Sequence, residues 1–113
     1  MQVYDAANRL AQEIKESEEY VNYKMAKEAI NLDTQLKKQI DEFEKARYDE
    51  QITYMQTGKQ DEEKLKNVQE LYAKLIEREE AKKYFDAELK FNILIGDVNK
   101  IISDAVKDIM GAF

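Results

Sequence analysis

Apolar side chains recur every three or four positions along most of the chain, which is the period of an amphipathic α-helix. Near the start, the residues that keep this spacing are Tyr4, Ala7, Leu10, Ala11 and Ile14. They predict a short helix over about residues 4–16. Ser17 is followed by two glutamates, as expected of a capping residue beside acidic side chains that the helix dipole favours. A second short helix is therefore predicted over about residues 18–31.

A loop with one glycine divides the rest of the chain. Asp33 is the next candidate N-cap, and the apolar pattern after it predicts a helix over about residues 34–56. Gly58 can adopt the left-handed backbone conformation that follows many helix ends, which places a loop at residues 57–60. The helical pattern resumes beyond this loop.

The pattern then continues from about residue 61 to about residue 110. Residues 68–85 include no serine, threonine, asparagine, aspartate, glycine or proline, so nothing local ends a helix there. The pattern leaves open whether this segment is one long rod or is kinked within residues 77–80.

The last part of this segment is unusually apolar. Between Phe91 and Met110, 11 of 20 residues are apolar, more than the three per heptad that one core-facing side needs. Such a helix is covered on more than one side, either by helices of its own chain or by a second copy. We expect a second copy, because the N-terminal helices are short. The predicted contact stripe is Phe91, Leu94, Val98, Ile101, Ile102, Ala105 and Ile109.

Together these elements predict an all-α fold. The expected architecture is an elongated antiparallel helical bundle or hairpin with a long C-terminal helix. Residues 1–113 are expected to form a single helical domain that assembles into a homodimer or a higher homo-oligomer.

The composition removes most catalytic chemistry. The chain has no proline, cysteine or histidine, so the usual nucleophilic thiol, neutral-pH proton carrier and transition-metal ligands are absent. A di-metal helical bundle needs Glu-x-x-His motifs, and a calcium loop needs an aspartate-rich segment with glycine; the sequence contains neither. We therefore expect a non-enzymatic protein with no catalytic, metal or cofactor-binding residues. A hydrolase that uses carboxylates and a bound metal is the alternative.

The charge balance limits the partners. The net charge is −6, from 18 basic and 24 acidic residues, and no segment is basic. We therefore expect no direct contact with nucleic acid and none with anionic lipid. The longest stretch of low charge, from residue 91 onward, still carries five charged side chains, which excludes a membrane span. The N-terminal residues lack the pattern of a secretory signal, so a cytoplasmic location is expected.

Several segments carry a family resemblance. They are Val-Tyr-Asp-Ala-Ala-Asn-Arg-Leu-Ala at residues 3–11, Ser-Glu-Glu-Tyr at 17–20, the Gly58 loop, and the apolar tail at 87–102. With these segments the chain resembles the YlbF/YmcA-like proteins of Gram-positive bacteria, nearest to the YheA branch. The resemblance implies an antiparallel all-α bundle that forms dimers or higher oligomers. It also implies a regulatory role, since better-studied relatives control development and competence in a complex linked to messenger-RNA processing.

Two departures limit what this resemblance carries. Relatives have cysteines associated with an iron–sulfur cluster; this chain has none, so that cofactor is not transferred to it. Relatives often show a helix-breaking Asn-Pro where this chain has Arg78-Glu79, so their helix boundary is in question here. The expected function is that of an interaction or regulatory protein. The alternative is an accessory factor in RNA processing or in a developmental regulatory complex.

Overall fold

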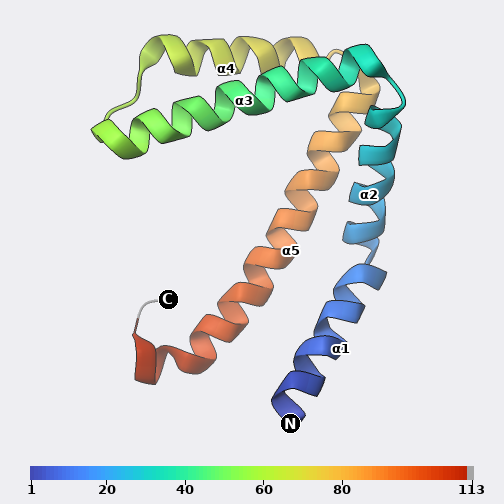
Figure 1. The fold of residues 1–113 in the computed structure, drawn as a ribbon, viewed down its shortest axis with the longest axis vertical. Helices are drawn as coiled ribbons and strands as arrows, with labels where there is room; N and C mark the ends of the chain where they lie inside the picture. The colour runs from blue at the N-terminus through green and yellow to red at the C-terminus, as the bar shows by residue number, and fades with distance from the viewer. Residues whose placement is uncertain (112–113) are drawn as a thin grey trace. The chain divides into compact units, whose positions relative to one another are not determined.

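The protein is mostly helical in the part of the chain that the computed structural model describes, residues 1–111 (Figure 1). Within these residues no strand occurs, which confirms the all-α fold class. The helices are α1 (Gln2–Glu16), α2 (Glu18–Asn31), α3 (Thr34–Thr57), α4 (Glu62–Leu75) and α5 (Glu79–Met110).

Polar side chains start three of these helices. Ser17, Asp33 and Asp61 each accept a hydrogen bond from the backbone N–H three positions further on, at 3.1, 3.0 and 3.2 Å respectively. Each bond satisfies one of the N–H groups that a first helical turn leaves without a partner. These residues therefore fix where α2, α3 and α4 begin, and the sequence predicts this role for Ser17 and Asp33.

Gly58 ends α3 in the predicted conformation. Its φ is 72°, in the left-handed region, and its N–H donates to the carbonyl of Tyr54 at 2.8 Å. The chain then turns back, and α3 and α4 lie side by side in opposite directions (Figure 1). Near the turn, the Lys64 ammonium donates to the Thr53 hydroxyl at 2.7 Å and lies 3.2 Å from an Asp49 oxygen. These contacts join the two helices close to the loop.

The helical segment after the loop is interrupted. Of the two arrangements that the pattern leaves open, the structure has the break: α4 ends at Leu75, and α5 starts at Glu79. The turn between them contains neither glycine nor proline. It is closed by the backbone N–H of Arg78, which donates to the carbonyl of Leu75 at 3.0 Å. A helix boundary is therefore present here without an Asn-Pro pair.

The chain divides into two compact units, which are described separately. The hairpin unit is Ala26–Tyr84, and the terminal unit is Met1–Met25 together with the residues from Phe85 onward. Helices α2 and α5 each contribute residues to both units. The expectation that residues 1–113 form a single domain stays a prediction.

The hairpin unit contains most of the buried apolar side chains. Leu36 is fully buried, and the ring of Phe43 lies 5.7 Å from that of Tyr72 across α3 and α4. Burying a large aliphatic or aromatic side chain stabilises a fold by about 1.5–3 kcal/mol. The buried residues of this unit are Ile30, Leu36, Ile40, Phe43, Leu75, Ala81 and Tyr84.

The terminal unit has a thinner core. Phe85 and Ala87 are buried, but α1 has no buried residue, and its Leu10 and Ile14 are only half-buried. Helix formation alone is marginal for 15 residues in water. α1 therefore depends on the packing of its apolar side, and much of that side is exposed.

Candidate functional site

The predicted contact stripe on α5 divides into two parts. Phe91, Leu94 and Val98 are half-buried within the terminal unit. The remaining four residues are exposed: Ile101, Ile102, Ala105 and Ile109. The structure therefore separates a part that packs on its own chain from a part that no described residue covers.

Phe91 accounts for the first part. Its ring lies edge-on to Tyr20, with centroids 6.0 Å apart, and 5.6 Å from the ring of Tyr23. Tyr23 also donates from its hydroxyl to a Glu88 oxygen at 3.3 Å. Aromatic pairs at these distances favour edge-on and tilted arrangements. The start of the stripe is thus covered by α2 of the same chain.

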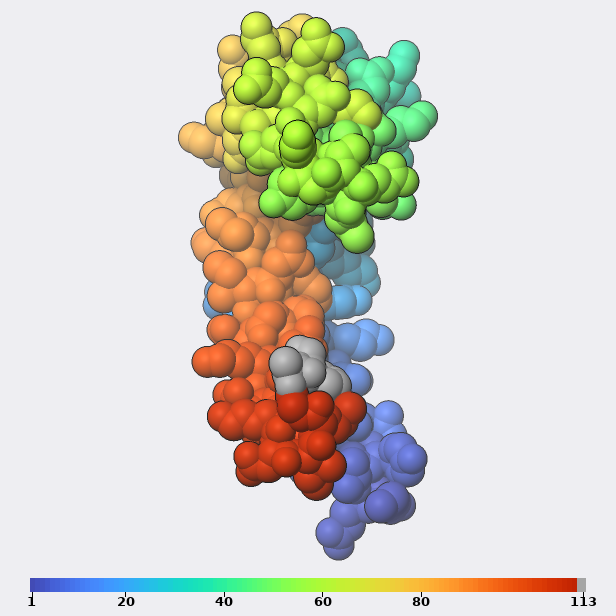
Figure 2. All heavy atoms as spheres, turned by 90° about the vertical axis from the view of Figure 1, so that its left-hand side faces the viewer, coloured from blue at the N-terminus to red at the C-terminus, as the bar shows by residue number. Residues whose placement is uncertain are grey.

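The end of α5 forms the second part. Ile101 is 70% exposed and Ile109 is 93% exposed, and the neighbouring Ile102, Ala105 and Met110 are exposed as well. In Figure 2 red side chains at this end of α5 face the viewer. A monomer gains nothing from presenting several large aliphatic side chains together to water. We call Ile101, Ile102, Ala105, Ile109 and Met110 the α5 end surface.

Two further exposed apolar sets lie in the terminal unit. Leu89 and Ile93 are exposed on α5, and Ile93 follows Phe91 by two positions, which places it on the opposite side of the helix. Val3 and Tyr4 are exposed on α1. The contact stripe predicted from the sequence includes none of these residues. Ile93 lies within the apolar excess of residues 91–110, and Tyr4 lies within the apolar spacing of residues 4–14, whereas Leu89 and Val3 lie outside both ranges.

Some charged groups on the surface form ion pairs within one helix. Asp86 and Lys90, which are four positions apart on α5, lie 3.0 Å from each other. Within residues 1–111, no group of three or more acidic side chains is placed to hold a metal ion. None of the helices described is long and apolar enough to cross a membrane.

Asp33 has a perturbed carboxyl group. The backbone N–H of Leu36 and, second, the guanidinium of Arg78 lower its pKa from the usual 3.8. Arg78 donates to Asp33 at 2.8 Å and to Glu80 at 3.0 Å, and these bonds raise the pKa of its guanidinium. Asp33 caps α3 and Arg78 closes the turn before α5, so the pair is explained by its structural role.

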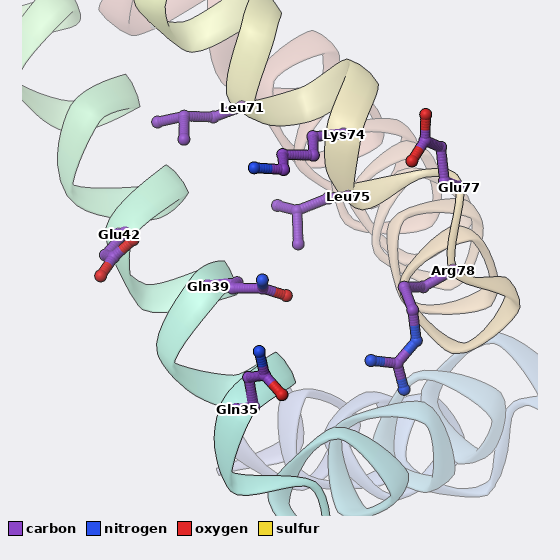
Figure 3. Close-up of a pocket in the computed structure, with 8 residues that line it drawn as sticks. All are labelled: Gln35, Gln39, Glu42, Leu71, Lys74, Leu75, Glu77 and Arg78. Atoms are coloured by element: carbon purple, nitrogen blue, oxygen red, sulfur yellow. The ribbon is translucent and has the colours of Figure 1, made fainter.

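The hairpin unit also has a groove between α3 and α4, with a volume of about 280 Å³ (Figure 3). Leu71 and Leu75 form its apolar wall, and polar side chains surround it. The residues that line it are Gln35, Gln39, Glu42, Leu71, Lys74, Leu75, Glu77 and Arg78. The sequence pattern does not reveal this groove, because its two sides are separated in the chain by at least the 29 positions between Glu42 and Leu71.

The chain is similar to known proteins over almost its whole length. A family model described as "Control of competence regulator ComK, YlbF/YmcA" matches residues 3–107. Similar proteins include a UPF0342 protein of Desulfitobacterium hafniense, which is 33% identical over 97% of this chain and 89% of its own length. A UPF0342 protein of Clostridium novyi is 35% identical over 96% and 95% of the two chains. One of Bacillus cereus is 31% identical over 97% and 93%.

Proposed function

Because the chain belongs to the YlbF/YmcA family, we propose that it is a non-enzymatic interaction protein that acts as a homodimer or higher homo-oligomer in the cytoplasm. The observation that carries the proposal is the exposed apolar surface of the terminal unit. It includes the α5 end surface, Leu89 and Ile93, and Val3 and Tyr4 of α1.

The partner that we propose for the α5 end surface is a second copy of this chain. Every copy presents the same aliphatic side chains, so one symmetric contact covers the surface on both copies at once. Isoleucine, leucine and methionine are typical of the interfaces of permanent homodimers, which resemble a core more than a polar surface. The side chain of Ile109, which is 93% exposed, gains most from such a contact.

A non-catalytic role is supported by composition and by the relatives. The sequence offers serine and threonine hydroxyls without a histidine base, and carboxylates that pair with lysine and arginine on the surface. The names of the three relatives described above state no reaction. Binding to other proteins needs only the surface just described.

Sedimentation of an α5 variant and a matched control tests this proposal. Ile101→Asp places a charge in the α5 end surface and is expected to raise the dissociation constant of the oligomer about thirtyfold or more. Lys100→Gln makes the net charge more negative by the same one unit at an exposed position on the opposite side of α5, and it is expected to leave assembly unchanged. Circular dichroism verifies that both variants stay helical. A wild-type protein that sediments as a monomer at about 100 μM, or equal effects of the two variants, would contradict the proposal.

The family description favours a second, compatible role in the control of a competence regulator. In that role the chain contacts proteins, as an accessory factor in developmental regulation or RNA processing. Its net charge of −6 argues against direct contact with RNA. Filter binding is expected to detect no complex with RNA, and a signal that weakens steeply with salt would contradict this expectation.

A further inference from the structure

We propose that the groove between α3 and α4 binds a carboxylate that is attached to a short branched aliphatic group. This site lies in the hairpin unit and is independent of the α5 end surface. The source of such a ligand is either a small organic acid or the last residue of a polypeptide, because both present the same chemistry.

Three hydrogen-bond donors converge on the groove from its two sides. Gln35 and Gln39 lie one turn apart on α3, and Lys74 extends from α4 toward them (Figure 3). None of the three side chains forms a hydrogen bond or an ion pair with another residue of the described chain. Their polar atoms are therefore available to a ligand, and the lysine supplies a charge-assisted bond to a carboxylate.

The position of Lys74 is not explained by a helical ion pair. The acid that precedes it by four residues, Glu70, lies 4.0 Å from Lys66 instead. Lys74 points across the groove toward α3 (Figure 3). Its ammonium disfavours a cationic ligand, while each glutamine amide can donate to whichever acceptor the ligand presents.

The apolar wall of the groove is the reason why we propose a branched aliphatic group in the ligand. Leu75 is buried and Leu71 is half-buried, and they lie one turn apart on α4. A branched group of three or four carbons covers this wall and leaves its carboxylate beside the donors. The volume of about 280 Å³ is near the lower limit of ligand pockets, which fits a small ligand.

The groove prefers a carboxylate because of the directions in which its charged side chains point, and not because of the net charge of its lining. Two cationic and two anionic residues line it, so their formal charges cancel. The carboxylate of Glu77 is directed away from the groove, and Glu42 lies at the opposite margin from Arg78 (Figure 3). Asp33 and Glu80 already pair with Arg78, which leaves Lys74 as the cation of the lining that has no acidic partner among the described residues.

Titration followed by NMR tests the proposal. The probes are 4-methylpentanoate and N-acetyl-leucine, and the matched neutral control is N-acetyl-leucinamide. The side-chain NH₂ signals of Gln35 and Gln39 report on the groove itself. Both acids are expected to shift these signals with a dissociation constant of about 1 mM, which is ordinary for ligands of this size, and the amide is expected to bind about tenfold more weakly.

The order of the two affinities identifies the source of the ligand. If N-acetyl-leucine binds more tightly than 4-methylpentanoate, the source is the end of a polypeptide chain; the reverse order indicates a small acid. Equal affinities mean that the groove recognises only the carboxylate and the branched aliphatic group, which both probes share.

Two lysine variants distinguish a direct contact with Lys74 from an effect of the overall charge of the protein. Lys74→Gln is expected to weaken binding of both acids about tenfold, because it removes the charged donor. Lys38→Gln removes the same charge from an exposed position on α3 outside the lining and is expected to change nothing. The proposal is overturned if the acid and its amide shift the glutamine signals equally. It is also overturned if the two lysine variants weaken binding alike, or if no saturable shift occurs up to about 50 mM probe.

Discussion

The guanidinium of Arg78 donates a hydrogen bond to Asp33 at 2.8 Å, although 45 positions separate the two residues in the chain. Asp33 is also the N-cap of α3, and Arg78 lies in the turn between α4 and α5. One contact thus joins the turn that starts the helical hairpin to the turn that ends it. The same carboxylate stabilises the first turn of α3 and holds the far end of α4 in place.

This pair predicts a specific loss of stability in acid. The backbone N–H of Leu36 and then Arg78 lower the pKa of Asp33, so the folded-state pKa lies below the usual 3.8. The stabilisation is therefore complete above pH 3.8 and is lost as the pH falls through the folded-state pKa. Asp33→Asn is expected to lower the melting temperature by a constant amount between pH 5 and 7, and by less below pH 3.8. A difference that grows in acid would contradict this assignment. Arg78→Gln removes one cause of the lowered pKa of Asp33. This variant is therefore expected to bring the folded-state pKa closer to 3.8, so that the loss of stability in acid extends over a narrower range of pH.

Two glycine variants are expected to act in opposite directions. Gly58 has a φ of 72°, where a side chain is strained, and no atom lies within 4 Å of the position a Cβ would take. Gly58→Ala is therefore expected to lower the free energy of unfolding by about 1 kcal/mol, through backbone strain alone. Gly96 lies inside α5 and also has open space around it. Gly96→Ala is expected to raise the stability of the monomer by about 0.5–1 kcal/mol, measured by urea unfolding at low protein concentration.

Two leucines near the start of α3 test where the core lies. Leu36 is fully buried, whereas Leu32, four positions earlier, is 88% exposed. Leu36→Ala is expected to cost about 2–5 kcal/mol, because it removes buried apolar surface and leaves a cavity. Leu32→Ala is expected to change stability by less than about 0.5 kcal/mol. Similar losses for both variants in urea unfolding would place the core elsewhere.

The two parts of the α5 stripe are expected to respond differently to mutation. Phe91→Ala removes the ring contacts to Tyr20 and Tyr23 and is expected to destabilise the chain by about 1–2 kcal/mol at any protein concentration. Ile109→Ser is expected to leave the monomer almost unchanged and to weaken assembly. Thermal unfolding over a range of concentrations separates these effects, because only assembly makes the melting temperature depend on concentration. A concentration dependence that survives Ile109→Ser would exclude Ile109 from the interface.

The sequence predicts the helices well where a local chemical signal marks an end. Ser17, Asp33 and Gly58 form hydrogen bonds with residues three or four positions away. The helix ends that they determine can therefore be predicted from the local sequence. The break before α5 could not be placed this way. Nothing in residues 68–85 disfavours a helix locally, and the turn is joined to Asp33 by a contact that the pattern does not reveal.

The candidate sites were predicted only in part. The apolar excess of residues 91–110 indicates that several sides of α5 are covered, but it does not say by what. The stripe therefore included Phe91, whose ring lies against two tyrosines of α2. Glu70 precedes Lys74 by four positions but lies 4.0 Å from Lys66, and Lys74 points into the groove toward α3. Both differences arise from contacts between distant segments.

The fifteen residues of α1 contain no buried side chain, so little within one copy holds this helix against fraying. If a second copy supplies the missing cover, dilution alone melts α1 while the hairpin unit keeps its structure. Amide protons of α1 would then exchange with solvent fastest in dilute samples.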